Sequence, residues 1–84
     1  MPGGREARAA LRELHDRYEN LTPREREVLA HVVGGKLNKQ IAFDLSTAER
    51  TIKAHRASIM EKLQVQSVAE LARLAQELGI KPIR

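Results

Sequence analysis

Apolar residues recur at three- and four-residue intervals along most of the chain, which is the spacing of one face of an α-helix. No stretch alternates apolar and polar residues convincingly enough to predict a strand. The first helical pattern lies among charged residues and consists of Ala7, Ala10, Leu11, Leu14 and Tyr18. Similar patterns follow as far as the C-terminal region. The sequence therefore predicts an all-α fold of four or five helices.

The stretch LTPRERE carries the best-marked helix start in the chain. Thr22 is suited to the N-cap and Pro23 to the first helical position, while Glu25 completes a capping box with Thr22. This helix should end at Gly34-Gly35, because glycine favours the backbone conformation that terminates helices. Thr22 and Glu25 thus have a sufficient structural explanation.

Three further helices follow. Asn38 is predicted to cap a short helix, KQIAFDL, and after a turn a longer basic helix runs to about Lys62. Ser67 is predicted to cap the last helix, with Glu70 three residues later as a second capping box, and Gly79 to end it. A short helix, a turn and a longer basic helix form the helix-turn-helix pattern.

The start of the longer helix is less clear, because two hydroxyl residues precede it. Ser46 would form a capping box with Glu49, but it would leave almost no turn after Leu45. We therefore expect Thr47 or Ala48 at the cap position, with the Thr47 hydroxyl as the capping group.

The size and composition limit the class of protein. The chain has 84 residues, enough for one small domain. It has no cysteine, which excludes a disulfide framework and a thiolate metal site. No apolar run is long enough to cross a membrane, and the N-terminus does not resemble a secretory signal. We expect a soluble cytoplasmic protein that does not bind to membranes.

The positive charge is concentrated in the middle of the chain. The formal net charge is +4, and residues 35–63 contribute most of it, with six cationic and three acidic side chains. A local basic excess is weak evidence for a polyanionic partner when taken alone.

The longer basic helix has two different faces when about 100° is allowed per residue. Ile52, Ile59 and Leu63 fall on one side, with His55 and Arg56 flanking them. The opposite side carries Arg50, Lys53, Ala54, Ala57 and Glu61. Small alanines let a helix approach a groove while long cations reach outward. This face therefore suits insertion into the DNA major groove.

Three blocks of sequence closely resemble one family. LTPREREVL, NKQIAFDL and RTIKAHRASIMEKL resemble the LuxR/FixJ/NarL-type helix-turn-helix domain of bacterial transcription regulators, in the same order and spacing, over about residues 21–78. REARAALRELHDRYEN resembles the linker helix that joins this domain to a phosphorylatable receiver in FixJ-like response regulators. The resemblance implies a linker helix in residues 1–20, a DNA-binding domain in residues 21–84 and a receiver that this chain lacks.

The family resemblance assigns roles to helices and residues. It implies a scaffold helix at 23–33, a positioning helix at 38–45, a recognition helix at 48–62 and a dimerisation helix at 67–78. A dimer would place two recognition helices in successive major grooves. Candidate DNA contacts are Lys53, Ala54 and Ala57 for bases, Arg50 facing the DNA, and Thr51, Lys39, Asn38, Thr47 and Arg56 near phosphates. Candidate dimer contacts are Val68, Leu71, Ala72 and Ala75.

Two positions depart from the family pattern. Many members have a long polar or basic residue where this chain has Ala57, so direct base reading should depend more on Lys53, Arg50 or DNA shape. An aliphatic residue usually stands at the position of Thr47 and a hydroxyl residue at that of Ala48. This puts the first turn of the recognition helix, and a phosphate contact there, in doubt. Arg56 lies near the core flank, where it either snorkels or contacts one phosphate.

Other functions remain open at this point. A sigma-factor promoter-recognition domain shares a similar opening and helix-turn-helix, although the TIKAH core and the helix after it argue against that interpretation. A helical protein-protein adaptor is the alternative from a different class. RNA polymerase is one further candidate partner. The sequence predicts neither the operator nor the direction of regulation.

Chemistry-bearing residues do not form a recognisable site. His15 and His31 lie on separate helices without carboxylates at ligand spacing, so we expect no metal or other cofactor, and His55 is interpreted as a packed residue bonded to backbone. No nucleophile-base set is present, and we expect no enzyme activity. Phe43 lies off the apolar face of its helix. It is either exposed or packed, and we favour packing on the N-terminal helix or on an absent receiver.

Overall fold

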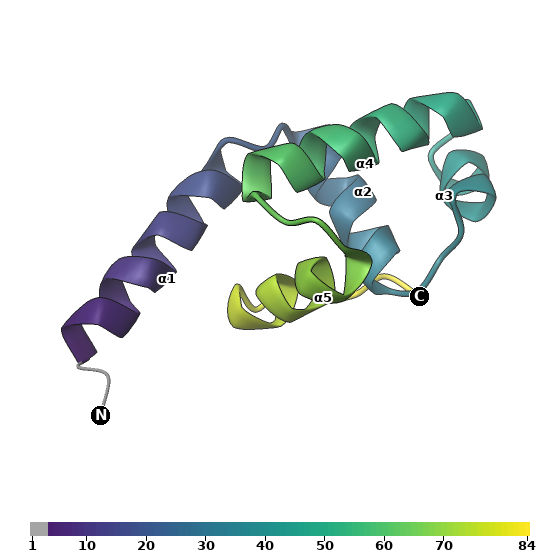
Figure 1. Cartoon of the computed structure of the whole chain (residues 1–84). Coiled ribbons are helices and arrows are strands. Elements are labelled where there is room, and N and C mark those ends of the chain that lie inside the picture. Colours follow the sequence, from purple (N-terminus) through teal and green to yellow (C-terminus); the bar gives the residue numbers. More distant parts are fainter. Residues whose placement is uncertain (1–3) are drawn as a thin grey trace.

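The computed structural model describes residues 4–84, which form five α-helices and no strand (Figure 1). The predicted all-α fold is therefore confirmed. The helices are α1 (Gly4–Glu19), α2 (Pro23–Val33), α3 (Asn38–Asp44), α4 (Glu49–Leu63) and α5 (Val68–Glu77). The bounds of α2 to α5 agree with the predicted ranges to within one residue. Helix α1 ends one residue before the predicted limit at residue 20, and residues 1–3 of that prediction lie outside the described residues.

The core is a single aliphatic cluster around α2. Val28 and Leu29 of α2 are fully buried, and α2 contacts α3, α4 and α5. The other helices contribute buried side chains to the same cluster, among them Ile41, Ile52, Ile59, Leu63 and Leu71. Burial of these side chains is the main force that holds α3 and α4 against α2.

The predicted start of α2 is confirmed in detail. The Thr22 hydroxyl accepts from the Glu25 backbone N–H at 3.1 Å, and the Glu25 carboxylate accepts from the Thr22 N–H at 2.9 Å. The helix ends at Val33, with Gly34 at the C-cap and Gly35 in the left-handed region at φ 88°. Only glycine adopts that conformation at little cost, which explains the predicted stop.

The predicted cap of α3 is wrong, and the predicted capping box of α5 is only half formed. Asn38 is the first residue of α3 rather than its cap, which is Leu37. Ser67 caps α5 as predicted, through a 3.2 Å bond from the Glu70 N–H. The reciprocal bond is absent from this second box, because the Glu70 carboxylate accepts from the Gln66 N–H at 3.1 Å.

The turn between α3 and α4 explains where the recognition helix begins. Ala48 is the N-cap of α4, which is one of the two positions that were predicted. No side chain caps the helix, so the predicted capping role of the Thr47 hydroxyl is wrong. Ser46 has a left-handed backbone at φ 54°. The Thr47 N–H reaches the Ala42 carbonyl at 2.9 Å and the Ser46 N–H reaches that of Phe43 at 3.2 Å. These two bonds form a Schellman motif that ends α3 and aims the chain toward α4.

Only the second half of α1 packs on the domain. Leu14 is buried, and the Tyr18 ring lies 4.9 Å from the Arg26 guanidinium carbon, a cation–π contact. Leu11 is 42% exposed and Ala7 and Ala10 are exposed. Figure 1 shows α1 extending away from the other helices toward the N-terminus. The predicted apolar face of this helix is therefore only half covered.

The C-terminal residues fold back on the end of α2. The Ile83 N–H donates to the Ala30 carbonyl at 3.0 Å. A side chain at position 34 would overlap the backbone carbonyl of Ile83. Gly34 thus serves the close approach of two chain segments, whereas Gly35 serves the turn.

Candidate nucleic-acid interface

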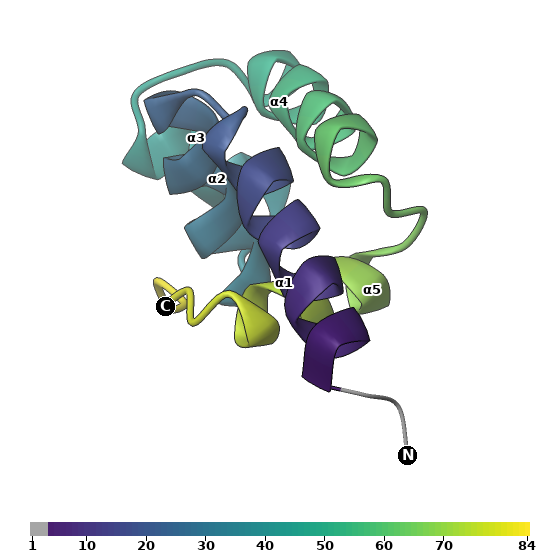
Figure 2. The same ribbon diagram turned by 90° about the vertical axis from the view of Figure 1, so that its left-hand side faces the viewer.

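The α4 helix has one buried and one free face, as its sequence predicts. Ile52, Ile59 and Leu63 are at most 1% exposed. Residues of the opposite face, Arg50, Lys53, Ala54 and Ala57, are exposed. Figure 2 shows α4 at the upper right of the molecule, and no other described helix lies over its outer side.

The free face carries two unpaired cations. Among the residues that the structure describes, the side chains of Arg50 and Lys53 have no hydrogen bond or ion pair. The small side chains of Ala54 and Ala57 lie on the same face and project little from the helix surface. This face can approach a polyanion closely while two long side chains reach toward it.

Two of the residues predicted to contact DNA are hydrogen-bonded to each other. The Arg56 Nη1 donates to the Asn38 Oδ1 at 2.6 Å, and both side chains are partly buried. The bond joins the middle of α4 to the first residue of α3. Of the other predicted phosphate contacts, Lys39 is exposed, whereas Thr47 and Thr51 are half-buried.

A buried carboxylate ties α4 to α2. Glu25 is 4% exposed, and it accepts from the Ser58 hydroxyl at 2.6 Å and from the Lys62 ammonium at 2.8 Å, besides its capping bond to Thr22. Burial alone would raise the pKa of Glu25. The bonds from Lys62, Ser58 and Thr22 outweigh burial and lower that pKa from 4.5 to about 2.

Sequence reasoning did not find this network. Glu25 already had a role in the capping box, and its partners on α4 lie 33 and 37 residues away. The available signal was the spacing of Ser58 and Lys62, which are four residues apart and so share one side of α4.

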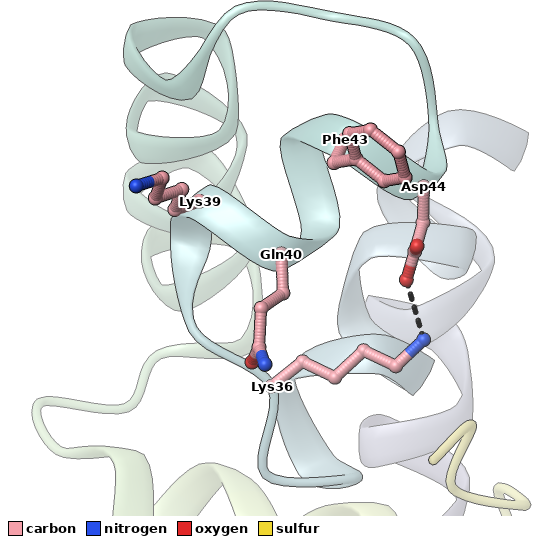
Figure 3. Close-up of a pocket in the computed structure, with 5 residues that line it drawn as sticks. All are labelled: Lys36, Lys39, Gln40, Phe43 and Asp44. Atoms are coloured by element: carbon pink, nitrogen blue, oxygen red, sulfur yellow. Dashed lines mark hydrogen bonds and ion pairs between the residues drawn. The ribbon is translucent and has the colours of Figure 1, made fainter.

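The loop between α2 and α3 is closed by an ion pair. The Lys36 ammonium lies 2.6 Å from the Asp44 carboxylate (Figure 3). This bond lowers the pKa of Asp44. Phe43, beside it, is 85% exposed. The expected packing of Phe43 on the N-terminal helix is therefore wrong.

The histidines contribute to no metal site among the described residues. His31 is buried, its Nδ1 has no hydrogen-bond partner, and burial lowers its pKa. His55 is half-buried, and no bond from its ring to backbone is present among the described residues, so that part of the expectation is wrong. Over residues 4–84, no three His, Cys, Asp or Glu side chains gather as a metal site, and no helix is long and apolar enough to cross a membrane.

The predicted dimer contacts separate into two groups. Leu71 and Ala75 are buried in the core of the domain itself, at 1% and 3% exposure. Val68 is 44% exposed and Ala72 is exposed. Only the second pair presents a surface to another molecule in this arrangement.

Comparisons with known proteins agree with this geometry. Residues 19–75 match the family of bacterial regulatory proteins described as the luxR family. The response regulator protein TodT of Pseudomonas putida strain F1 is 46% identical over 79% of this chain and 29% of its own length. The transcriptional regulatory protein FixJ of Rhizobium meliloti strain 1021 is 41% identical over 83% of this chain and 34% of its own length.

The solved structures show the same arrangement of helices. The response regulator StyR superposes with a TM-score of 0.85 and 44% identity, over 87% of this chain and 37% of that protein. The chain spans about a third of the length of the curated relatives that it matches. These matches do not favour a sigma-factor domain.

Proposed function

This chain belongs to the luxR family of bacterial regulatory proteins and has that family's DNA-binding helix-turn-helix domain, and on this premise we propose how it grips DNA. The α4 helix enters the major groove of an operator and reads its sequence. The observation that carries the proposal is the free face of α4, which holds Arg50, Lys53, Ala54 and Ala57 opposite a fully buried face. Arg50 and Lys53 are the reading side chains, since Ala54 and Ala57 cannot donate hydrogen bonds.

Binding would proceed from electrostatics to readout. The basic middle of the chain attracts the duplex, Lys39 and the threonines near the start of α4 bind phosphates, and Lys53 donates to base edges. The hydroxyls of half-buried Thr47 and Thr51 reach the phosphates from the flank of α4. Because only two long side chains reach from the free face, DNA shape contributes a larger share of the specificity.

We further propose a dimer on DNA. The contact would come from exposed Val68 and Ala72 on α5, while the buried side chains of Leu71 and Ala75 hold α5 on the core of its own domain. A twofold pair of domains places two α4 helices about one helical turn apart, near 10 base pairs. Selection of bound duplexes from a random pool tests this spacing directly.

The longer protein is inferred from the relatives. We propose that residues 1–20 form a linker helix and residues 21–84 the DNA-binding domain. The full protein adds a receiver, as the response-regulator name of TodT suggests, and acts on DNA in the cytoplasm without catalysis.

A salt titration with charge-reversal variants tests the proposal. For the selected duplex, log affinity should fall linearly with log salt concentration, and Lys53→Glu should lower affinity by about tenfold to hundredfold. Lys81→Glu is the matched control, because Lys81 is exposed on the tail after α5 and undergoes the same charge change. Equal losses in both variants would mean that only net charge matters. Failure to select any duplex would favour the adaptor alternative.

A further inference from the structure

His31 is a buried titratable side chain that the proposed DNA-binding face does not use. It lies in the last turn of α2 and is 7% exposed. Its Nδ1 is buried and has no hydrogen-bond partner among the described residues. A buried polar atom without a partner is uncommon in proteins and costs free energy. An aliphatic side chain would avoid that cost, so packing alone does not explain the imidazole ring.

His31 begins the junction of α2 and α3, which comprises residues 31–37. Its carbonyl accepts from the Lys36 N–H at 3.3 Å. The ammonium group of the same Lys36 bonds to Asp44 of α3 at 2.6 Å and so closes the junction (Figure 3). The α3 helix has seven residues, of which only Ile41 and Ala42 are buried. The closure of this junction therefore contributes substantially to holding α3 in place.

The surroundings of the His31 ring disfavour its protonated form. Burial is the main reason that the pKa of His31 lies below its ordinary value of 6.5, and the Lys36 ammonium lowers it further. Two carboxylates act in the opposite direction, those of Asp44 on α3 and Glu27 on α2. Each of them already has a cation beside it, since Asp44 holds Lys36 and Glu27 lies 3.6 Å from Arg24.

A protonated ring would have no free acceptor in this arrangement. Protonation makes both ring nitrogens donors, so the buried Nδ1 would become an unpaired N–H on a charged ring. The C-terminal tail, which bonds to this end of α2, brings only cations as charged side chains, Lys81 and Arg84. The protonated ring of His31 can therefore take Asp44 from Lys36, or it can leave its buried site for water. Either change removes a contact that closes the junction.

We propose that protonation of His31 opens the junction of α2 and α3 and thereby weakens DNA binding in mild acid. The proposal rests on the proposed DNA-binding function. The α3 helix carries Lys39 and ends in the turn that sets the start of α4, so its loosening displaces both. The expected direction is the reverse of a simple charge effect, because an added positive charge by itself strengthens binding to phosphates.

The pH range follows from the direction of the pKa change. Folding lowers the pKa of His31, so the fold has its full stability above pH 6.5 and loses part of it as the pH falls below that value. Glu25 and Asp44 stay ionised in this range because their pKa values are lowered. Between about pH 7.5 and about pH 5.5, the folding equilibrium constant of the wild type should fall by up to about tenfold.

His31→Gln removes the titrating group and keeps a polar side chain. Its folding equilibrium constant should change by no more than about twofold over the same pH range. His31→Leu serves the same purpose with an apolar side chain if glutamine destabilises the fold. His15→Gln is the matched control, because His15 is exposed on α1 and undergoes the same substitution. This control should retain the pH dependence of the wild type.

Amide hydrogen exchange locates the opening. The N–H groups of Ile41 and Thr47 make backbone bonds that hold α3. At about pH 5.5 they should exchange about threefold to tenfold faster in the wild type than in His31→Gln. The Leu71 N–H, which bonds to the Ser67 carbonyl at the start of α5, should exchange equally in both.

Affinity for the selected duplex is the functional measurement. Only molecules with a closed junction bind productively, so wild-type affinity should fall by at least about twofold between about pH 7.5 and about pH 5.5. The affinity of His31→Gln should stay constant or rise in acid. The two proteins should therefore respond to acid in opposite or clearly different directions at one salt concentration.

The remaining outcomes overturn the proposal. Equal pH dependence of stability in the wild type and the His31 variants would remove the switch. Equal acceleration of exchange at Leu71 and in α3 would show general destabilisation without a local opening. A wild-type affinity that rises in acid as in His31→Gln would refute control of DNA binding. Failure to bind any selected duplex would refute the proposed function and this control, while the exchange rates would still decide whether the junction opens.

Discussion

Replacement of the Glu25 carboxylate tests whether one buried ion pair holds the recognition helix on the domain. Glu25→Gln keeps the size of the side chain and an oxygen that can accept from the Thr22 N–H. It removes the negative charge that the Lys62 ammonium and the Ser58 hydroxyl contact at 2.8 and 2.6 Å. The fold should persist with weaker attachment of α4 to α2.

The magnitude follows from the pKa of Glu25. Its fall from 4.5 to about 2 corresponds, at about 1.4 kcal/mol for each pKa unit, to about 3 kcal/mol of stability at neutral pH. For a domain of this size each kcal/mol is about 4–8 °C in melting temperature. Glu25→Gln should therefore lower the melting temperature at pH 7 by about 12–24 °C.

The pH dependence has a definite direction. Since folding lowers the pKa of Glu25, the carboxylate stabilises the fold fully above pH 4.5 and loses this effect as pH falls toward 2. At pH 3 about 1.4 kcal/mol should remain. The stability difference between the wild type and Glu25→Gln should therefore shrink as the solution is acidified.

Urea unfolding at several pH values measures this difference. The chain has one tyrosine and no tryptophan, so far-ultraviolet circular dichroism is the suitable signal. Glu61→Gln is the matched control, since Glu61 is exposed on α4 and has no partner among the described residues. A difference below about 0.5 kcal/mol at pH 7, which is the scale of ordinary surface changes, would refute the reasoning. So would a difference that stays constant down to pH 3.

Three further substitutions test other contacts. Asn38→Ala and Arg56→Ala should each destabilise the domain by about 1–3 kcal/mol, and the two effects should be strongly non-additive in the double variant. Arg56→Ala should also leave the salt slope of DNA binding unchanged. A phosphate contact from Arg56 would instead make its loss lower the slope by about 0.9. Gly34→Ala should lower the melting temperature because its methyl group displaces the Ile83 backbone. In a chain truncated after residue 80 the same change should be neutral or stabilising, since φ at Gly34 is −76°, which alanine adopts readily.

The helices were predictable because their signals are local. Thr22, Glu25 and Ser67 act on backbone groups within three residues, and the apolar period of α4 repeats within the helix itself. The faces of α4 followed from the same period. Ser46 was harder, because a serine in a left-handed turn has no sequence signal comparable to that of a glycine.

The long-range contacts were not predictable by the same reasoning. Asn38 was suited to a cap, but its side-chain oxygen accepts a hydrogen bond from Arg56 of α4, 18 residues away. Asn38 is the first residue of α3, and its side chain makes this tertiary bond and no capping bond. Phe43 was expected to pack because an aromatic residue gains from burial, and nothing local revealed that neighbouring helices leave its side of α3 open.

The residues of α4 fall into two groups, those whose side chains bond to α2 or α3 and those of the free face. Arg56 is engaged with α3, and Ser58 and Lys62 are engaged with α2, so polar bonds hold the middle and the end of the helix. Within residues 4–84, the side chains of the free face make no such bonds. In the proposed mode of binding, DNA therefore orders few side chains, chiefly Arg50 and Lys53, at about 0.5–1.5 kcal/mol each. Substitutions on the free face should consequently change which duplex is bound without changing stability, and substitutions at the anchoring positions should do the reverse.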